Sequence, residues 1–207
     1  MRHRRTRLRA VWVTDAACQV EGRTAVNAPY TRRVIALFHR RRRALIGGVI
    51  CAVVVVATDM LFWSPASSRP RKADAVIVFG GAGSREAEGE RLVREGIAPI
   101  LAESVNTTYD PCYRQQARLP VICFRPQPLT TQGEARWLAT TARARGWHHV
   151  VVVVSVPQAT RARLRIRRCY SGGLQIVTVH LSVASMLANA AYEWGAMFKA
   201  LTLQRGC

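Results

Sequence analysis

The sequence predicts an α/β domain with a mainly parallel sheet, preceded by one membrane-spanning helix. Residues 44–63 form an almost unbroken apolar segment, about as long as the ~20 residues that cross a bilayer. Strand and helix patterns then alternate along residues 74–207, as they do in chains of βαβ units. The strand patterns are continuous runs of Val and Ile, which is typical of strands that are covered on both faces.

Residues 1–43 are expected to form a basic cytoplasmic tail. The chain of 207 residues carries a formal net charge of +19, but its only lysines are Lys72 and Lys199. An excess of Arg, Ala and Val is what a GC-rich genome produces, so the charge is weak evidence for a polyanionic partner. Aromatic residues such as Trp12 are too sparse in the tail to form a stacking platform. We therefore expect no nucleic-acid partner.

The apolar segment 44–63 is interpreted as a single-pass anchor in the cell membrane. Four consecutive arginines, residues 40–43, precede it directly, and Asp59 near its far end is its single charge. The positive-inside rule then places the N-terminus in the cytoplasm and the following domain outside. The proline, serine and arginine residues of segment 64–73 indicate a linker that lifts the domain off the membrane.

Three alternatives to the anchor are weighed against it. A cleavable signal peptide could use the small residues Pro65, Ala66 and Ser67, although the apolar core is longer than such signals need. A buried core helix is disfavoured by the arginine block. A lipoprotein signal is disfavoured because Ile50 precedes Cys51, where a small residue is required.

The strands of the domain are expected where short apolar runs end in turn residues. They cover DAVIVF at 74–79, PILAES at 99–104, VICFR at 121–125, HHVVVVVS at 148–155 and LQIVTVH at 174–180. The run at 148–155 holds five consecutive valines and is expected at the centre of the sheet. An irregular stretch that reaches Pro120 separates the second strand from the third.

Helices are expected between these strands, with a closing helix after the last one, and in the helix at 131–146 Trp137, Leu138 and the alanines lie on one side. The helices cover 85–96, 131–146, 160–170 and 183–203. The arginines of 160–170 are expected to form mostly a solvated surface, except Arg161 in the first turn. Two helical layers around a mainly parallel sheet make a Rossmann-like three-layer sandwich.

Three segments are expected to meet at the carboxyl edge of the sheet, where such folds bind ligands. They are the glycine turn 80–85, the loop 126–135 and the segment 155–161, and each leads into a helix. Helix N-termini with hydroxyl and arginine side chains suit an anionic or phosphorylated ligand. The candidate ligand-binding residues are Gly80, Gly81, Gly83, Ser84, Arg85, Thr130, Thr131, Glu134, Ser155, Gln158 and Arg161.

Structural explanations compete with this site. The glycines could serve turn geometry alone, and Glu86 stands where a dinucleotide-binding motif has its third glycine. A threonine followed three residues later by Glu134 is also a capping-box arrangement. The motifs GxSxG and HExxH are absent from the sequence, as is a cysteine and histidine spacing for zinc. We assign no catalytic residue, cofactor or metal.

Four cysteines fall in the external part of the chain. Cys18 lies in the tail and Cys51 in the apolar segment, which leaves Cys112, Cys123, Cys169 and Cys207. An even number in an external domain indicates disulfides, and four cysteines allow three pairings.

Several motifs together resemble the YdcF, SanA and ElyC family of envelope-associated proteins. They are DAVIVFGG with Arg85 downstream, EGIAPIL, TTQGEA and VVSVPQATRAR, spread over nearly all of residues 73–207. The stretch CFRPQPLTTQGEA, Trp147, RRCY and a C-terminal Gly-Cys are similar to a high-GC Gram-positive branch. This resemblance implies disulfides between Cys112 and Cys123 and between Cys169 and Cys207. It also implies a membrane anchor and a role in envelope biogenesis or barrier integrity, with no established common reaction.

The sequence departs from the family pattern at two places. Gln158 and Val154 replace a histidine and a threonine, and Ser104, Val105 and Asn106 stand in place of a glycine pair. Glutamine can hydrogen-bond a ligand but cannot act as a base. We therefore expect the outer domain to bind a phosphate-bearing small molecule or a wall or lipid-linked precursor. The alternative is a non-enzymatic module that docks on anionic lipid, wall polymer or a protein partner.

Overall fold

The structure is a computed structural model that describes residues 28–81, 83–105, 112 and 121–207, with side chains from Leu37 onward. The chain divides into two compact units, Met1–Val49 and Ile50–Cys207. The boundary falls inside helix α1, Ala28–Thr58, which continues as one turn of π-helix, η1, Asp59–Trp63. The stretch Leu37–Trp63 is long and apolar enough to span a membrane. Most of the predicted tail, residues 1–27, lies outside the described residues.

A five-stranded, all-parallel sheet forms the centre of the domain. Its strands are β1 Ala75–Val78, β2 Leu101–Ser104, β3 Val121–Phe124, β4 His149–Ser155 and β5 Gly173–Val179. Their order is β3-β2-β1-β4-β5. In register, Val76 lies beside Leu101 on one side and Val151 on the other. The predicted α/β class and parallel sheet are confirmed.

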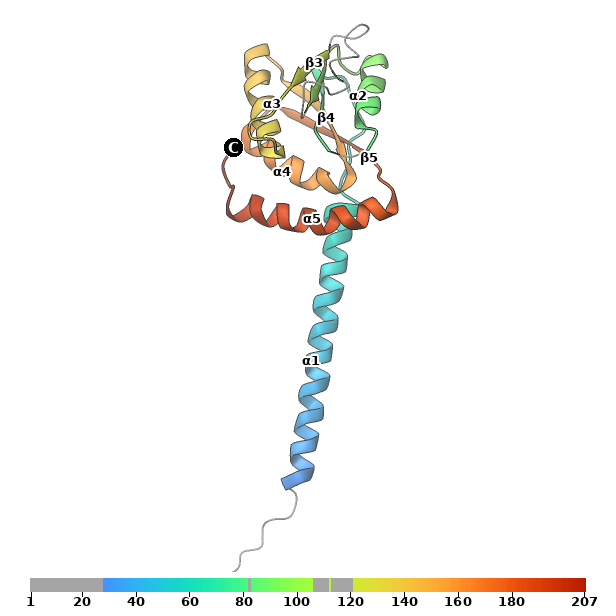
Figure 1. The fold of residues 1–207 in the computed structure, drawn as a ribbon, viewed down its shortest axis with the longest axis vertical. Coiled ribbons are helices and arrows are strands. Elements are labelled where there is room, and N and C mark those ends of the chain that lie inside the picture. Colours follow the sequence, from blue (N-terminus) through green and yellow to red (C-terminus); the bar gives the residue numbers. More distant parts are fainter. Residues whose placement is uncertain (1–27, 82, 106–111, 113–120) are drawn as a thin grey trace, which may run out of the picture. The chain divides into compact units, whose positions relative to one another are not determined.

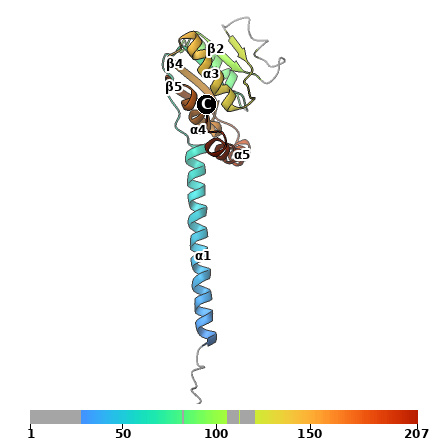
Figure 2. The ribbon, with the colours of Figure 1, turned by 90° about the vertical axis from the view of Figure 1, so that its left-hand side faces the viewer.

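Helices cover both faces of the sheet, which gives the predicted three layers (Figure 1). The helices are α2 Arg85–Arg94, α3 Thr131–Arg145, α4 Ala159–Cys169 and α5 Val183–Thr202. One apolar core joins α2 to one face, where Leu92 packs with Val78 and Val153. The other core joins α3 and α4 to the opposite face through Leu138 and Ile166. Helix α5 packs beside α4 (Figure 1 and Figure 2).

The linker 64–73 is hydrogen-bonded to the domain at several points. Ser68 donates from its backbone N to the carbonyl of Ile176 in β5 (2.7 Å). Arg163 of α4 donates to the carbonyl of Ala66 (2.6 Å). Its backbone is thus bonded along the outer edge of β5 and to α4.

The arginines of α4 are mostly bonded to backbone, which corrects the expected solvated surface. Arg165 is only 4% exposed and donates to both the carbonyl and the side-chain oxygen of Gln204. Arg168 donates to the carbonyls of Ala200 (2.8 Å) and Gln204 (3.1 Å). These bonds form because the C-terminal segment folds back over α4. Its carbonyl oxygens then accept hydrogen bonds from arginine side chains that would otherwise be hydrated.

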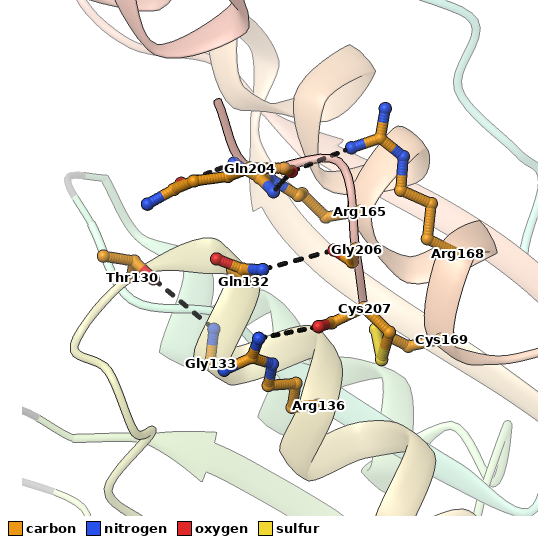
Figure 3. The surroundings of a disulfide bond; sticks show 10 residues. All are labelled: Thr130, Gln132, Gly133, Arg136, Arg165, Arg168, Cys169, Gln204, Gly206 and Cys207. Carbon is orange, nitrogen blue, oxygen red and sulfur yellow. Dashed lines mark hydrogen bonds between the residues drawn. A yellow bond between two sulfur atoms is a disulfide. The ribbon is translucent and has the colours of Figure 1, made fainter. Parts of the chain in front are cut away.

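Two disulfides close the domain, in the pairing that the family resemblance implied: Cys112 with Cys123 and Cys169 with Cys207. Figure 3 shows the second, which joins the end of α4 to the C-terminal segment. Arg136 of α3 donates to the carbonyl of Cys207 (2.7 Å), so the same segment also contacts α3.

Candidate functional site

A polar cleft lies at the carboxyl edge of the sheet, the place that the sequence predicts for a ligand. Its volume is about 210 Å³. Its walls come from the turn after β1, the end of β2, the start of α3, the segment after β4 and the middle of α5. The residues that line it are Gly80, Gly81, Ser104, Pro126, Leu129, Thr130, Thr131, Glu134, Ser155, Gln158, Arg161, Asn189, Tyr192 and Glu193.

The turn after β1 is held from the inside by Arg85. This side chain is 1% exposed and donates from Nη1 and Nη2 to the carbonyls of Phe79 and Gly81. Gly81 has a φ of +143°, a conformation that side-chain-bearing residues rarely adopt. Burial lowers the pKa of Arg85, although a guanidinium stays charged at neutral pH. Arg85 therefore shapes the turn, and it does not line the cleft.

Glu134 is the buried carboxyl group of the cleft. It is 3% exposed and accepts a hydrogen bond from the backbone N of Gly80, across the cleft from its own helix. Burial raises the pKa of Glu134, while its bonds with Gly80 and Ser104 act in the opposite direction. A carboxyl group with a raised pKa in a cleft is a candidate for proton transfer or for donating a hydrogen bond to a ligand.

The capping-box interpretation of Glu134 is wrong. The N-cap of α3 is Thr130, whose hydroxyl accepts from the backbone N of Gly133 (3.4 Å). This register places Glu134 one position beyond the box position, where its side chain reaches the glycine turn. Gly133 fits closely beneath the preceding loop: a Cβ there would lie 2.0 Å from the carbonyl oxygen of Pro128. The glycine of the TTQGEA motif is therefore required by packing.

The hydroxyl of Thr131 connects two segments of the cleft. It accepts from Nη1 of Arg161 (2.6 Å) and from Nε2 of Gln158 (3.2 Å). The amide nitrogen of Gln158 also approaches the carbonyl of Gly80 (3.4 Å). Gln158 therefore joins the turn after β1 to the start of α3.

Arg161 is paired with a glutamate of α5. It donates from Nε to Oε2 of Glu193 (2.6 Å) and from Nη2 to Oε1 (2.7 Å). Arg161 is 8% exposed and Glu193 3% exposed. Burial acts to lower the pKa of Arg161, but the hydrogen bond and charge of Glu193 outweigh it and the pKa lies above its ordinary value. An anion that binds Arg161 must therefore compete with Glu193.

The structure brings together eight of the eleven candidate ligand-binding residues. The cleft is lined by Gly80, Gly81, Thr130, Thr131, Glu134, Ser155, Gln158 and Arg161. The other three are Gly83, Ser84 and Arg85. A Cβ on Gly83 would lie 2.9 Å from the side chain of Leu181, so this glycine faces the segment after β5.

The sequence analysis missed the wall that α5 contributes. Asn189, Tyr192 and Glu193 line the cleft, and none of them is among the candidate ligand-binding residues that the sequence predicts. A signal was present, because Glu193 is the only acidic residue after Glu134 in a region rich in arginine. A single acid within an apolar helix indicates a buried partner of opposite charge.

No protein-family model matches the chain, and a search of curated proteins finds no match. Among the described residues, no group of three or more His, Cys, Asp or Glu side chains is placed to hold a metal ion.

Proposed function

We propose that the chain is a membrane-anchored protein whose outer domain binds a phosphate-bearing small molecule, or a wall or lipid-linked precursor, in this cleft. The observation that carries the proposal is the cluster of Arg161, Thr131 and Gln158 at the carboxyl edge of the sheet. Arginine is well suited to phosphate because its planar group donates two parallel hydrogen bonds.

Helix dipoles add to the attraction for an anion. Helices α3 and α4 begin at Thr131 and Ala159, and both starts adjoin the cleft. The N-terminus of a helix carries partial positive charge and favours a bound anion. Hydroxyl groups of Thr130 and Ser155 are available at the same edge to hydrogen-bond the oxygens of a phosphate.

The pairing of Arg161 with Glu193 suggests how such a ligand enters. A phosphate replaces the Glu193 carboxylate on Arg161, and the displaced carboxylate moves toward the open side of the cleft. Glu134 sits opposite with a raised pKa, so that in its neutral form it donates a hydrogen bond instead of repelling the ligand. Binding is the proposed activity, and we assign no reaction.

The external location belongs to the same proposal. The apolar helix is long enough to span a membrane, and two disulfides suit an oxidising compartment. Arg40–Arg43 at the start of the apolar segment favour a cytoplasmic N-terminus. The resemblance to the YdcF, SanA and ElyC family supports a role in the cell envelope.

The test is phosphate binding by the full chain in lipid nanodiscs, measured by isothermal titration calorimetry. The probes are inorganic phosphate and a short polyprenyl phosphate. Glu193→Gln releases Arg161 and should bind more tightly than the wild type. The double variant Arg161→Gln with Glu193→Gln removes the cation without leaving a buried charge unpaired. Its affinity for phosphate should be lower than that of Glu193→Gln by at least about tenfold, the effect of one charged hydrogen bond.

The matched control is Arg167→Ala, which removes an exposed arginine of the same helix. It should bind like the wild type. If the wild type and Glu193→Gln both fail to bind either probe, or if the double variant binds as tightly as Glu193→Gln, the proposal is wrong.

A second candidate function is a non-enzymatic module that docks on anionic lipid, wall polymer or a protein partner. A basic groove of about 500 Å³ favours it, with Arg69, Arg71 and Arg167 among its lining residues. Docking through exposed arginines weakens steeply as salt is raised, whereas binding in the buried cleft does not. Sedimentation with an anionic wall polymer at low and high salt separates the two candidates.

A further inference from the structure

Helix α5 has two apolar faces, and only one of them packs on the domain. The inner face buries Ala190, Met197 and Ala200, with Glu193 among them. A second row of apolar residues follows the helical period at intervals of three and four residues. This outer stripe consists of Val183, Leu187, Ala191, Trp194, Phe198 and Leu201.

The outer stripe is exposed along the whole helix. Val183 is 78% exposed at one end, Leu187 is 55% exposed, and Phe198 and Leu201 are 66% and 50% exposed toward the other end. The two residues of α5 that are charged at neutral pH, Glu193 and Lys199, lie outside the stripe. A continuous exposed row of large apolar side chains marks a surface that is covered in the working protein.

The position of the stripe indicates what covers it. Its middle residue, Trp194, contacts the end of the apolar helix: the ring of Phe62 lies 5.4 Å from the Trp194 ring in an edge arrangement. The indole Nε1 of Trp194 donates to the hydroxyl of Thr58 (3.0 Å). All three residues belong to the compact unit Ile50–Cys207. Tryptophans near the ends of membrane-spanning segments lie at the level of the lipid headgroups. Trp194 of α5 contacts such an end, so the same level is expected for it.

We propose that α5 lies in the lipid–water interface of the membrane that Leu37–Trp63 spans, with the outer stripe turned toward the acyl chains. A helix of 20 residues extends about 30 Å, so the stripe carries this contact well beyond the point where the anchor leaves the membrane. An amphipathic helix with large apolar residues on one face binds a bilayer surface in this way. The proposal requires no ligand in the cleft.

The position of α5 in the interface also selects among the ligands of the proposed function. This step rests on that proposed function. Asn189, Tyr192 and Glu193 of α5 line the cleft, so the cleft opens beside the headgroup layer. A phosphate carried on a lipid reaches Arg161 from the membrane without leaving it. Among the ligands of the proposed function, the lipid-linked class fits this geometry best.

The test places a photo-reactive benzoylphenylalanine at single positions of the full chain in phosphatidylethanolamine and phosphatidylglycerol vesicles. Positions 187 and 201 probe both ends of the stripe. Trp194 is not used, because it contacts the apolar helix and would lie near lipid whether or not the rest of the stripe does. Position 144 is the control, because Ala144 is exposed at the far end of α3, about 20 Å from the carboxyl edge. Intact disulfides on a non-reducing gel confirm that each variant is folded. If the variant at position 187 or 201 does not fold, position 198 is used in its place.

We expect lipid adducts at positions 187 and 201, detected by mass spectrometry at severalfold the yield of position 144. Absence of lipid adducts at both stripe positions overturns the proposal, and so does a crosslinked dimer, which would show that a second copy covers the stripe. The vesicle lipids carry phosphate themselves, so the adduct at position 201 decides independently of the binding test, because it lies beyond Glu193, away from the residues of α5 that line the cleft. If position 201 crosslinks to lipid while the calorimetry finds no phosphate binding, only the proposed function fails.

Discussion

Arg161 and Glu193 form a two-bond ion pair across the cleft, with N–O distances of 2.6 and 2.7 Å and almost no solvent exposure. The pair joins α4 to α5, two helices that lie 32 residues apart at these positions. It is the electrostatic centre of the candidate site, because it decides whether the arginine is available to a ligand.

Arg161→Ala should destabilise the domain more than the loss of one surface charge. It leaves Glu193 buried without its cation, and breaking a buried pair on one side typically costs about 3–5 kcal/mol of unfolding free energy. The double variant Arg161→Met with Glu193→Leu should recover most of this loss. Chemical denaturation of the full chain in detergent measures both, and equal stability of the single and double variants would contradict the argument.

Glu134→Gln should change how stability depends on pH. Burial raises the pKa of Glu134 in the folded state above that of a free glutamate, about 4.3. The folded state then binds the proton more tightly, so stability falls as pH rises through the folded pKa. Glutamine at this position does not titrate, so the variant does not lose stability in this way. Its free energy of unfolding, measured by denaturation at a series of pH values, should rise relative to that of the wild type from acid to neutral pH. Glu95→Gln, at an exposed position at the end of α2, is the control variant for the same measurement.

Gly133→Ala and Gly195→Ala should have opposite effects although both glycines are helical. A Cβ at Gly133 meets backbone atoms of Gln127 and Pro128 at 2.0–3.0 Å. We expect a loss of at least about 2 kcal/mol, as for overpacking against rigid neighbours. A Cβ at Gly195 meets nothing within 4 Å, so alanine should stabilise α5 by about 0.5–1 kcal/mol through helix propensity. Thermal unfolding of the two variants checks the pair.

Removing the Cys169–Cys207 disulfide should cost more than removing Cys112–Cys123. The first bond closes a separation of 38 residues and the second one of 11. Loop-closure entropy predicts losses of about 4 and about 3 kcal/mol for the double serine variants. Denaturation under oxidising conditions measures both losses. A larger loss at Cys112–Cys123 would mean that native packing, not loop length, sets the order.

Much of the fold could be predicted from the sequence because its strands are buried on both faces. The valine run of β4 and the glycines at the helix ends are local signals, and they locate most of the sheet and helices. The first half of the site followed from the rule that ligands bind at carboxyl strand ends, which brought Gly80, Thr131 and Gln158 together.

The remaining parts depend on contacts that no local pattern carries. Glu193 enters the cleft because α5 crosses the carboxyl edge, and helical periodicity alone cannot place a helix in space. The capping-box hypothesis is wrong because the helix is capped by Thr130 and not by Thr131, which moves Glu134 one residue beyond the box position. The composition of segment 64–73 predicts a linker, but its bonds to β5 and α4 use mainly the backbone, which composition does not reveal.

The linker bonded to β5 has a consequence for how this protein meets copies of itself. The outer edge of an open sheet is a template on which another chain can add a strand and start aggregation. Beside Ile176 that edge is occupied by Ser68, whose backbone N and hydroxyl take up the carbonyl and the N–H of Ile176. The segment between the apolar helix and β1 thus protects this part of the sheet against edge-to-edge pairing with other copies of the chain.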